Sequence, residues 1–301
     1  MKKTTVGGQA VIEGVMMRGL KGIATAVRLT DGSIDVKMEE STSLTKKNKF
    51  FGLPIIRGFV SLIESLIIGI KSIEYSASFF EDEDEEESKF DKWFQNTFKD
   101  KANNILMGIS LVLSLVLSVA LFFILPTLLA SAVKKFITSN VIVLNIMEGI
   151  IRVIIFLSYV FFIGKLEDIN RLYQYHGAEH KTIFCYENGE ELTPVNAKKY
   201  VRFHPRCGTN FLFLVMVISI IIFSFTGWQS VWQRILSRVL LLPLVSGVTY
   251  EVIRWLGKSD SKIAKIIAWP GLLLQNITTK EPDESMLEVA IVALKTAEGI
   301  E

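Results

Sequence analysis

The feature that most constrains this chain is residues 104–131, a stretch that contains no Asp, Glu, Lys or Arg. Its most apolar part, residues 105–125, is long enough as a helix to cross the ~30 Å hydrocarbon core of a bilayer. The mean hydropathy of the chain is +0.38, which is higher than a soluble domain usually reaches. The sequence therefore predicts an integral membrane protein.

Three further apolar runs follow, at residues 141–164, 211–225 and 235–256. Short loops join the first run to the second and the third to the fourth, so we expect two helical hairpins, 104–164 and 211–256. The fold class expected is an α-helical integral membrane protein with about four transmembrane helices, an interfacial amphipathic helix and a small β-containing N-terminal cytoplasmic unit.

The orientation of the spans follows from Lys and Arg, which mark cytoplasmic loops. They are most numerous in the loop 165–210, at Lys165, Arg171, Lys181, Lys198, Lys199, Arg202 and Arg206. We therefore expect this loop and both termini to be cytoplasmic, with the lipid bilayer as the first partner. The net charge is only +2, and no basic stripe interleaved with aromatic residues occurs, so nucleic acid is not an expected partner.

Residues 1–49 predict the β-rich unit, because Asp31-Gly32 is a hairpin turn signal between two apolar runs. The glycine-rich segment before this hairpin is expected to be a flexible loop, with close approach to another segment as the alternative. Residues 50–80 carry an amphipathic stripe and predict a helix lying in the membrane interface, with a partly inserted hairpin as the alternative.

The remaining polar segments are a linker and a tail. The acidic run at residues 81–87 makes 81–103 a solvated linker. In the cytoplasmic tail, 257–301, Pro282 precedes an acidic turn and an apolar stripe. We expect a short amphipathic helix there, docked on the N-terminal unit or on the membrane surface.

The loop 165–210 holds all three histidines and both cysteines of the chain. If its first part is helical, His176 and His180 are one turn apart and their imidazoles converge, as a divalent metal requires. His204 and Cys207 follow in a tight turn and would complete a four-coordinate His₃Cys set. Zn²⁺ is the expected metal by ligand type, with iron or manganese as alternatives if a carboxylate replaces the thiolate. Cys185 is a spare ligand.

The same segment offers groups for catalysis. Four protein ligands make a closed structural site, whereas three leave a position open for chemistry. Glu179, in an inverted HxxEH pattern, would then handle protons, and Arg206 would steady an anionic intermediate.

Charged residues also occur within the apolar runs. Glu148 and Arg152 are four residues apart, and we expect them to pair toward the bundle interior or to lie near the headgroups. Glu251 is expected to pair with Arg254 or Arg152, with a role beside the metal loop as the alternative.

Five ordered motifs carry a resemblance over essentially the whole chain: GGQAVIEGVMMRG, YHGAEHKTI, RFHPRCGTNF, PLVSGVTYEVIRW and LQNITTKEPDESMLEVAI. Together they resemble the YqhQ-type family of bacterial membrane proteins, a domain of unknown function described as metal-dependent enzymes. The resemblance implies a metal role for His176, Glu179, His180, His204 and Cys207. It implies location in the bacterial inner membrane and names no substrate.

Three functions stay open at this point. The first is a metal-dependent hydrolase acting at the cytoplasmic face. The second is a non-enzymatic membrane factor, in which a structural metal holds the loop while the protein docks a partner such as the protein translocation or insertion machinery. The third is a transporter, which four spans without an internal repeat could form only as an oligomer.

Overall fold

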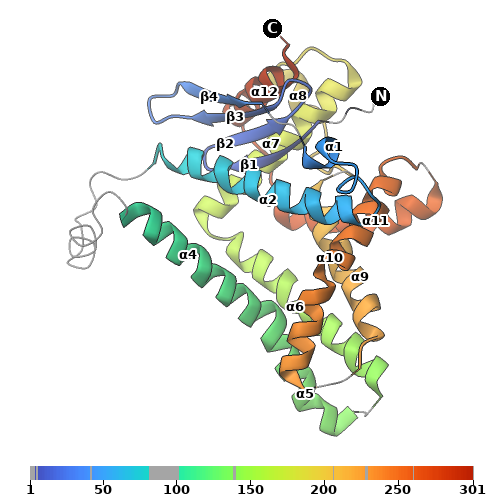
Figure 1. Ribbon diagram of the computed structural model, residues 1–301. Coiled ribbons are helices and arrows are strands. Elements are labelled where there is room, and N and C mark those ends of the chain that lie inside the picture. Colours follow the sequence, from blue (N-terminus) through green and yellow to red (C-terminus); the bar gives the residue numbers. More distant parts are fainter. Residues whose placement is uncertain are drawn as a thin grey trace.

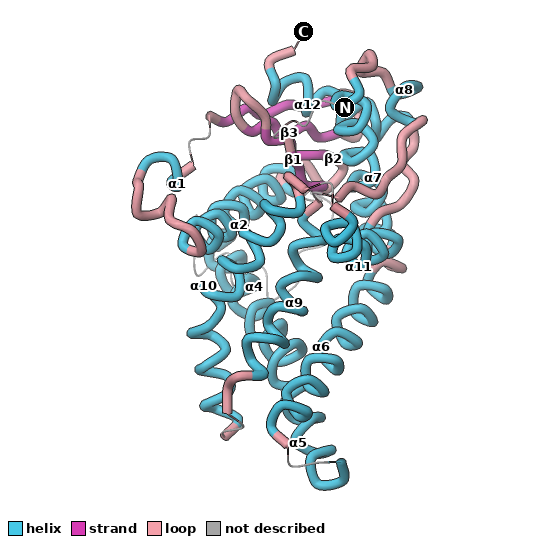
Figure 2. The backbone as a smooth tube through the Cα atoms, turned by 90° about the vertical axis from the view of Figure 1, so that its right-hand side faces the viewer, coloured by secondary structure: helices cyan, strands magenta, loops and turns pink. Residues whose placement is uncertain are grey.

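The computed structural model describes residues 4, 6–40, 43–80, 102–137, 140–205, 207–227, 230–259 and 261–300. Figure 1 shows a sheet-and-helix unit at one end and long, splayed helices at the other, and Figure 2 shows the same division from the side. The first and last described residues both lie at the sheet end. The expected combination of a mainly helical chain with a small N-terminal sheet is confirmed.

Among the described residues, three helices are long and apolar enough, by length and composition, to cross a membrane: Gly108–Ala132, Val141–Ile163 and Trp232–Leu256. The other expected span is a shorter apolar helix, Gly208–Ser224. These segments belong to α4 (Ala102–Val119), η2 (Ala120–Ile124), α5 (Leu125–Ile137), α6 (Val141–Ile163), α9 (Gly208–Ser224) and α10 (Val231–Leu256). The expected linker falls mostly outside the described residues.

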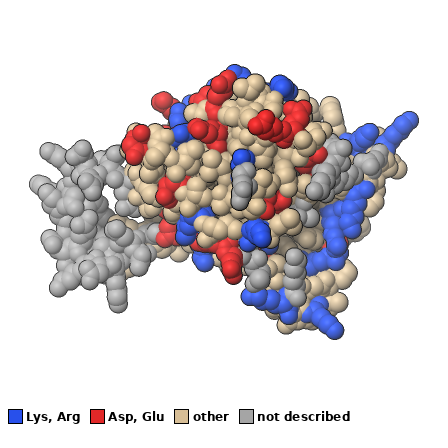
Figure 3. Space-filling view, turned by 90° about the horizontal axis from the view of Figure 1, so that it is seen from above, with Lys and Arg blue, Asp and Glu red and all other residues tan. Residues whose placement is uncertain are grey.

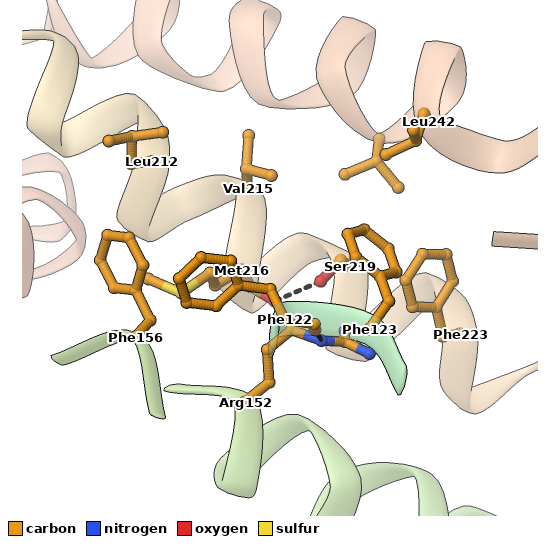
Figure 4. A pocket seen from close by; sticks show the side chains of 11 residues that line it. Phe122, Phe123, Arg152, Phe156, Leu212, Val215, Met216, Ser219, Phe223 and Leu242 are labelled. Carbon is orange, nitrogen blue, oxygen red and sulfur yellow. Dashed lines mark hydrogen bonds between the residues drawn. The ribbon is translucent and has the colours of Figure 1, made fainter. Parts of the chain in front are cut away.

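The first long helix contains a π-helical turn, η2, whose cause is Pro126. Proline has no N–H, so the carbonyl of Phe122, four residues earlier, loses its helical donor. Arg152 of α6 supplies the replacement, donating from Nε to that carbonyl at 2.9 Å. Its guanidinium lies 5.3 Å from the Phe123 ring centroid and 5.9 Å from that of Phe223. It borders an apolar cavity of about 240 Å³ (Figure 4).

A buried charge cluster ties α5, α6 and α10 together. The expected Glu148–Arg152 ion pair is confirmed, with 3.3 Å between Nη2 and Oε1. Arg238 pairs more closely, with Nη2 2.8 Å from Glu148 Oε2, and Arg234 Nη1 lies 3.4 Å from the same oxygen. Thr127 also donates to Glu148 at 2.6 Å. The Glu148 carboxylate thus pairs with three guanidinium groups.

The N-terminal sheet is an antiparallel meander in the order β1-β2-β3-β4. Its strands are β1 (Gly7–Val11), β2 (Gly14–Arg18), β3 (Ile23–Arg28) and β4 (Ile34–Glu39). The hairpin at Asp31-Gly32 is confirmed: Gly32 has φ +85°, and the Asp31 carboxylate accepts a hydrogen bond from the Ser33 N–H at 2.9 Å. The expectation of a flexible loop before this hairpin is wrong, because the glycine-rich segment forms β1 and β2.

One face of the sheet packs on α7 (Glu167–Asn188) and α12 (Glu284–Glu298). The stripe of α12 contributes Met286, Leu287 and Leu294, which are at most 1% exposed. They pack in one core with Val15 and Met17 of β2. The tail helix is therefore docked on the N-terminal unit, which is one of the two expected alternatives.

Helix α2 (Ile56–Ala77) lies across the boundary between the sheet unit and the long helices (Figure 1). Its buried residues are small: Gly58, Gly69, Ser72 and Ser76. A Cβ at Gly58 would lie 2.8 Å from the Gly247 Cα atom of α10. Large apolar side chains on its other side are exposed: Leu66 by 53%, Ile67 by 51% and Ile70 by 44%. Such a helix buries its small residues against protein and offers its apolar face to the surroundings.

The remaining helices of the described segments are α1 (Leu44–Lys47), α8 (Pro194–Lys198) and α11 (Lys262–Thr278). The sequence interpretation missed α11, which packs on the start of α9: a Cβ at Gly271 would lie 2.1 Å from Asn210 Oδ1. Seen from above, the sheet unit carries acidic and basic side chains, with Lys and Arg gathered toward the right-hand margin (Figure 3). This face is charged, in contrast to the apolar long helices.

Candidate metal centre

The centre begins with two histidines on one face of α7. This helix has Glu167 and Asp168 in its first turn and ends at Gly189, whose φ is +72°, both of which are typical helix boundaries. The helical period therefore brings His176 and His180 together as expected, with ring centroids 4.5 Å apart. The first half of the predicted ligand set is juxtaposed by local structure alone.

Backbone carbonyls orient both imidazoles. Nδ1 of His176 lies 2.9 Å from the carbonyl oxygen of Thr278, and Nδ1 of His180 lies 2.5 Å from that of Arg202. A carbonyl only accepts, so each Nδ1 must carry the proton and donate it. Each Nε2 is then left with a lone pair, which is the arrangement usual for histidine ligands.

The third donor, Cys207, is the N-cap of α9, and its sulfur accepts from the Thr209 N–H at 3.4 Å. Cys207 Sγ lies 3.1 Å from Nε2 of His176. Donor atoms of His176, His180 and Cys207 all lie within 4.8 Å of one another. The structure thus gathers three of the four expected ligands.

His180 shows why a further atom would fit between these donors. Its Nε2 is buried and has no hydrogen-bond partner of normal geometry among the described residues. Burial lowers the pKa of His180, an effect that nearby Cys207 only partly offsets. The ring is therefore held neutral, the form that binds metals.

His204 lies next to this group without belonging to it. Its ring centroid is 5.6 Å from that of His180 and 4.7 Å from that of Phe184. Its Nε2 is 3.9 Å from Oε2 of Glu187, a buried carboxylate of α7 that also accepts from Thr4 at 2.9 Å. As a metal ligand, His204 stays a prediction.

The other expected groups lie in different places. Cys185 is buried in the sheet–helix core and donates from Sγ to the carbonyl of Glu191 at 3.5 Å. Arg206 lies outside the described residues. The expected pairing of Glu251 with Arg254 or Arg152 is wrong: Glu251 accepts from Nε of Arg57 at 2.6 Å. That contact joins α2 to α10 and does not reach the histidines.

Glu179 lies one residue before His180 and faces strand β1. Gly8 and Glu179 approach closely, because a Cβ at Gly8 would lie 3.0 Å from the Glu179 carboxyl carbon. Burial raises the pKa of Glu179, against smaller lowering effects of His176 and the Gly8 N–H. A carboxyl group with a raised pKa is suited to exchanging protons near neutral pH.

A cavity of about 470 Å³ adjoins these groups. It lies between β1, α2, α7 and the start of α9, and His176, Glu179 and Cys207 all line it. Ser65 and Thr209 line it as well. The histidine–cysteine group is therefore open to a space that a small molecule or a chain segment could fill.

Several residues of the site escaped the sequence interpretation. The side chain of Gln275 in α11 makes two hydrogen bonds to the backbone of His204, accepting from its N–H at 2.7 Å and donating to its carbonyl at 2.9 Å. Gly8 and Gln9 of β1 and Thr209 of α9 border the cavity. The motifs GGQAVIEGVMMRG and LQNITTKEPDESMLEVAI contain most of these residues, yet neither motif carries metal-ligand chemistry that would have drawn attention to it.

In the part of the chain that the structure describes, fold and site define a mainly helical protein with three helices long and apolar enough to cross a membrane, a small antiparallel sheet and a possible His₂Cys metal site. The chain belongs to the family described as "Protein of unknown function (DUF1385)", which matches residues 53–299. It is 34% identical over 286 residues to "Uncharacterized protein YqhQ" of Bacillus subtilis (strain 168), covering 95% of this chain and 89% of that protein. The resemblance to the YqhQ-type family is confirmed. No solved structure matches the chain.

Proposed function

We propose that His176, His180 and Cys207 bind one divalent transition metal ion, Zn²⁺, and that the protein is a metal-dependent hydrolase of the bacterial inner membrane. The observation that carries the proposal is the combination of three converging donors with an adjoining cavity that also contains Glu179. Three protein ligands leave a fourth coordination position open, as in catalytic zinc sites.

The donor set supports zinc on chemical grounds. Two imidazoles and one thiolate are borderline-soft ligands that favour Zn²⁺ over Mg²⁺ or Ca²⁺. The carbonyls of Thr278 and Arg202 direct both Nε2 atoms toward Cys207, which is the usual outer support of a zinc-bound histidine. His204, with its ring beside Glu187, acts in this proposal as a neighbour that packs against His180.

The metal would supply Lewis acidity for the attack of water on a carbonyl group. Glu179 would accept the proton of that water at Oε2, which is buried and has no hydrogen-bond partner among the described residues, and return it to the leaving group. Its raised pKa supports both halves of this transfer. Cleavage thus adds a hydroxyl to the acyl carbon and a proton to the departing atom.

The membrane part of the proposal places the sheet unit and both termini in the cytoplasm. It is supported by the exposed apolar side chains of α4, among them Leu113 at 64% and Leu117 at 66%, since surface of that kind requires a lipid environment. The basic residues of the loop 165–210 support the orientation. Alkaline phosphatase fused after Glu301 should be inactive, and green fluorescent protein at the same point should fluoresce.

The metal site is tested by elemental analysis of the full chain purified in detergent without chelators. We expect about one zinc ion per chain, lost in the His176→Ala/His180→Ala variant. Cys207→Ser should lower the zinc content, whereas the matched change Cys185→Ser, at the cysteine in the core, should not. Equal zinc in all four proteins would refute the ligand assignment.

Catalysis is tested separately with Glu179→Gln, which keeps the shape of the side chain and removes its proton exchange. The zinc-loaded wild type and this variant are compared on fluorogenic esters, phospholipids and peptides. We expect hydrolysis by the wild type and a loss of 10²-fold or more in the variant, on the order of a general acid–base contribution. A zinc-loaded wild type that cleaves none of them would favour the structural alternative, in which the metal joins α7 to the start of α9.

A further inference from the structure

Strand β1 forms an edge of the sheet, and its free edge can be oriented from the register. The neighbouring β2–β3 ladder contains hydrogen bonds from Gly19 N to Gly22 O and from Arg28 N to Glu13 O, both 2.8 Å. Odd-numbered residues of β2 therefore bond to β3, and even-numbered ones bond to β1.

The pairing of β1 with β2 places Val11 opposite Gly14 and Gln9 opposite Met16. Val11 and Gln9 therefore point their backbone groups into the sheet. Gly8 and Ala10, which alternate with them, point N–H and C=O away from it.

The outward groups of Ala10 and the Gly8 carbonyl face the metal cavity. Gly8, Gln9 and Ala10 all line the 470 Å³ space that His176 and Glu179 border from α7. A second cavity, of about 210 Å³, shares Gly8, Gln9 and Ser65 with the first, and Met16, Arg18 and Ile68 place it over the face of the sheet that α2 covers. The first cavity thus forms a groove along Gly8–Ala10 at the edge of β1, beside the metal donors.

The side chains of this edge leave the backbone accessible. Gly7 and Gly8 have none, and a Cβ at Gly7 would meet nothing within 4 Å. No side chain or loop among the described residues hydrogen-bonds the outward groups of Ala10. An uncovered strand edge is a template for another extended chain, and proteins usually protect such edges with charge, proline or a covering element.

We propose that this groove binds a polypeptide in extended conformation, paired as an added strand with Gly8 and Ala10, and that the hydrolase is therefore a peptidase. This inference rests on the proposed function. In the reaction, the oxygen of water bonds to the peptide carbonyl carbon, the C–N bond breaks, and a proton of that water ends on the leaving nitrogen. A lipid ester would make no use of the backbone groups of the strand.

The test uses the zinc-loaded full chain in detergent with quenched fluorescent octapeptides, the same peptides N-methylated at alternate amides, and a fluorogenic phospholipid ester. The wild type should cleave the octapeptides, and N-methylation should raise KM about tenfold for each strand hydrogen bond lost. Ala10→Pro, which removes one outward N–H, should raise KM similarly with little change in kcat or zinc content.

Met38→Pro makes the same chemical change on the opposite edge strand, β4, and should leave KM unchanged. Since the N-methylated peptides test the strand pairing on the wild type, a misfolded Ala10→Pro variant would not remove the test. If N-methylation leaves the KM for peptide cleavage unchanged, the proposed strand pairing is wrong. Zinc binding with cleavage of the phospholipid alone overturns the peptidase and keeps the hydrolase, and a wild type without zinc overturns the metal site beneath both.

Discussion

Gly8 in the first strand lies against the carboxyl group of Glu179 in the histidine-bearing helix: a Cβ at Gly8 would lie 3.0 Å from the Glu179 carboxyl carbon. The two residues are far apart in the chain, and their contact brings the edge of the sheet to the candidate metal centre. Glu179 is buried, and the nearby Gly8 N–H acts against the rise in its pKa that burial causes. Strand β1 is therefore part of the site as well as of the core.

Gly8→Ala should disturb this contact. Its Cβ would lie 2.6 Å from the Met16 carbonyl and 3.0 Å from the Glu179 carboxyl carbon, and overpacking of this kind costs roughly 1–3 kcal/mol. We expect a lower Tm and weaker hydrolysis with zinc still bound. Gly7→Ala, whose Cβ would meet nothing within 4 Å, is the matched control for Tm. Equal Tm values for the two variants would contradict the close approach.

Gln275→Leu should loosen the backbone beside the metal donors. The substitution keeps much of the side-chain volume and removes both hydrogen bonds to His204. The His204 carbonyl keeps the Cys207 N–H at 3.3 Å, whereas the His204 N–H loses its bond to Gln275, which costs about 1–3 kcal/mol. We expect zinc affinity to fall about 10- to 100-fold, as for other supporting residues. Competition with a zinc-binding dye measures it. Asn276→Leu, at the exposed neighbouring residue, should leave the zinc affinity unchanged. Equal zinc affinities of the two variants would contradict a role of the Gln275 hydrogen bonds.

Glu148→Gln should destabilise the bundle strongly. It leaves Arg152, Arg234 and Arg238 buried without their shared carboxylate, and breaking a buried ion pair on one side costs about 3–5 kcal/mol. Arg238→Met in the same chain should recover part of the loss, which thermal unfolding of the single and double variants in detergent would measure. Additive effects of the two substitutions would show that they do not interact.

Asp283 should make the docking of α12 sensitive to acid. Burial alone would raise its pKa, but hydrogen bonds from Ser285 and the Met286 N–H outweigh burial and hold the pKa below 3.8. A lowered pKa stabilises the fold above pH 3.8, and this contribution is lost as pH falls through the folded-state value. Asp283→Ala should cost about 1 kcal/mol near neutral pH, since it removes the helix cap.

Asp283→Asn keeps the cap without the titration and serves as the control. The difference in Tm between wild type and Asp283→Asn should shrink as pH falls below 3.8. A difference that is constant with pH would contradict the assigned role of the carboxylate.

Local pattern was sufficient for several elements. The apolar runs predicted the long helices, because a helix of that length and composition follows from neighbouring residues alone. Helical spacing likewise predicted that His176 and His180 converge, and the Asp31-Gly32 signal predicted its hairpin. The amphipathic stripe of the tail predicted α12 for the same reason.

Tertiary structure decided which distant groups meet. Whether Cys207 or His204 lies beside the two histidines depends on how α11 holds the turn before α9. No local sequence pattern predicts the hydrogen bonds by which Gln275 holds that turn. Glu251 pairs with Arg57 because α2 crosses α10 at Gly58 and Gly247, which no spacing along the chain could indicate. Long-range packing also places the edge of β1 beside Glu179. The glycine-rich strand carries no reactive side chains, so only its packing against the histidine-bearing helix makes it part of the site.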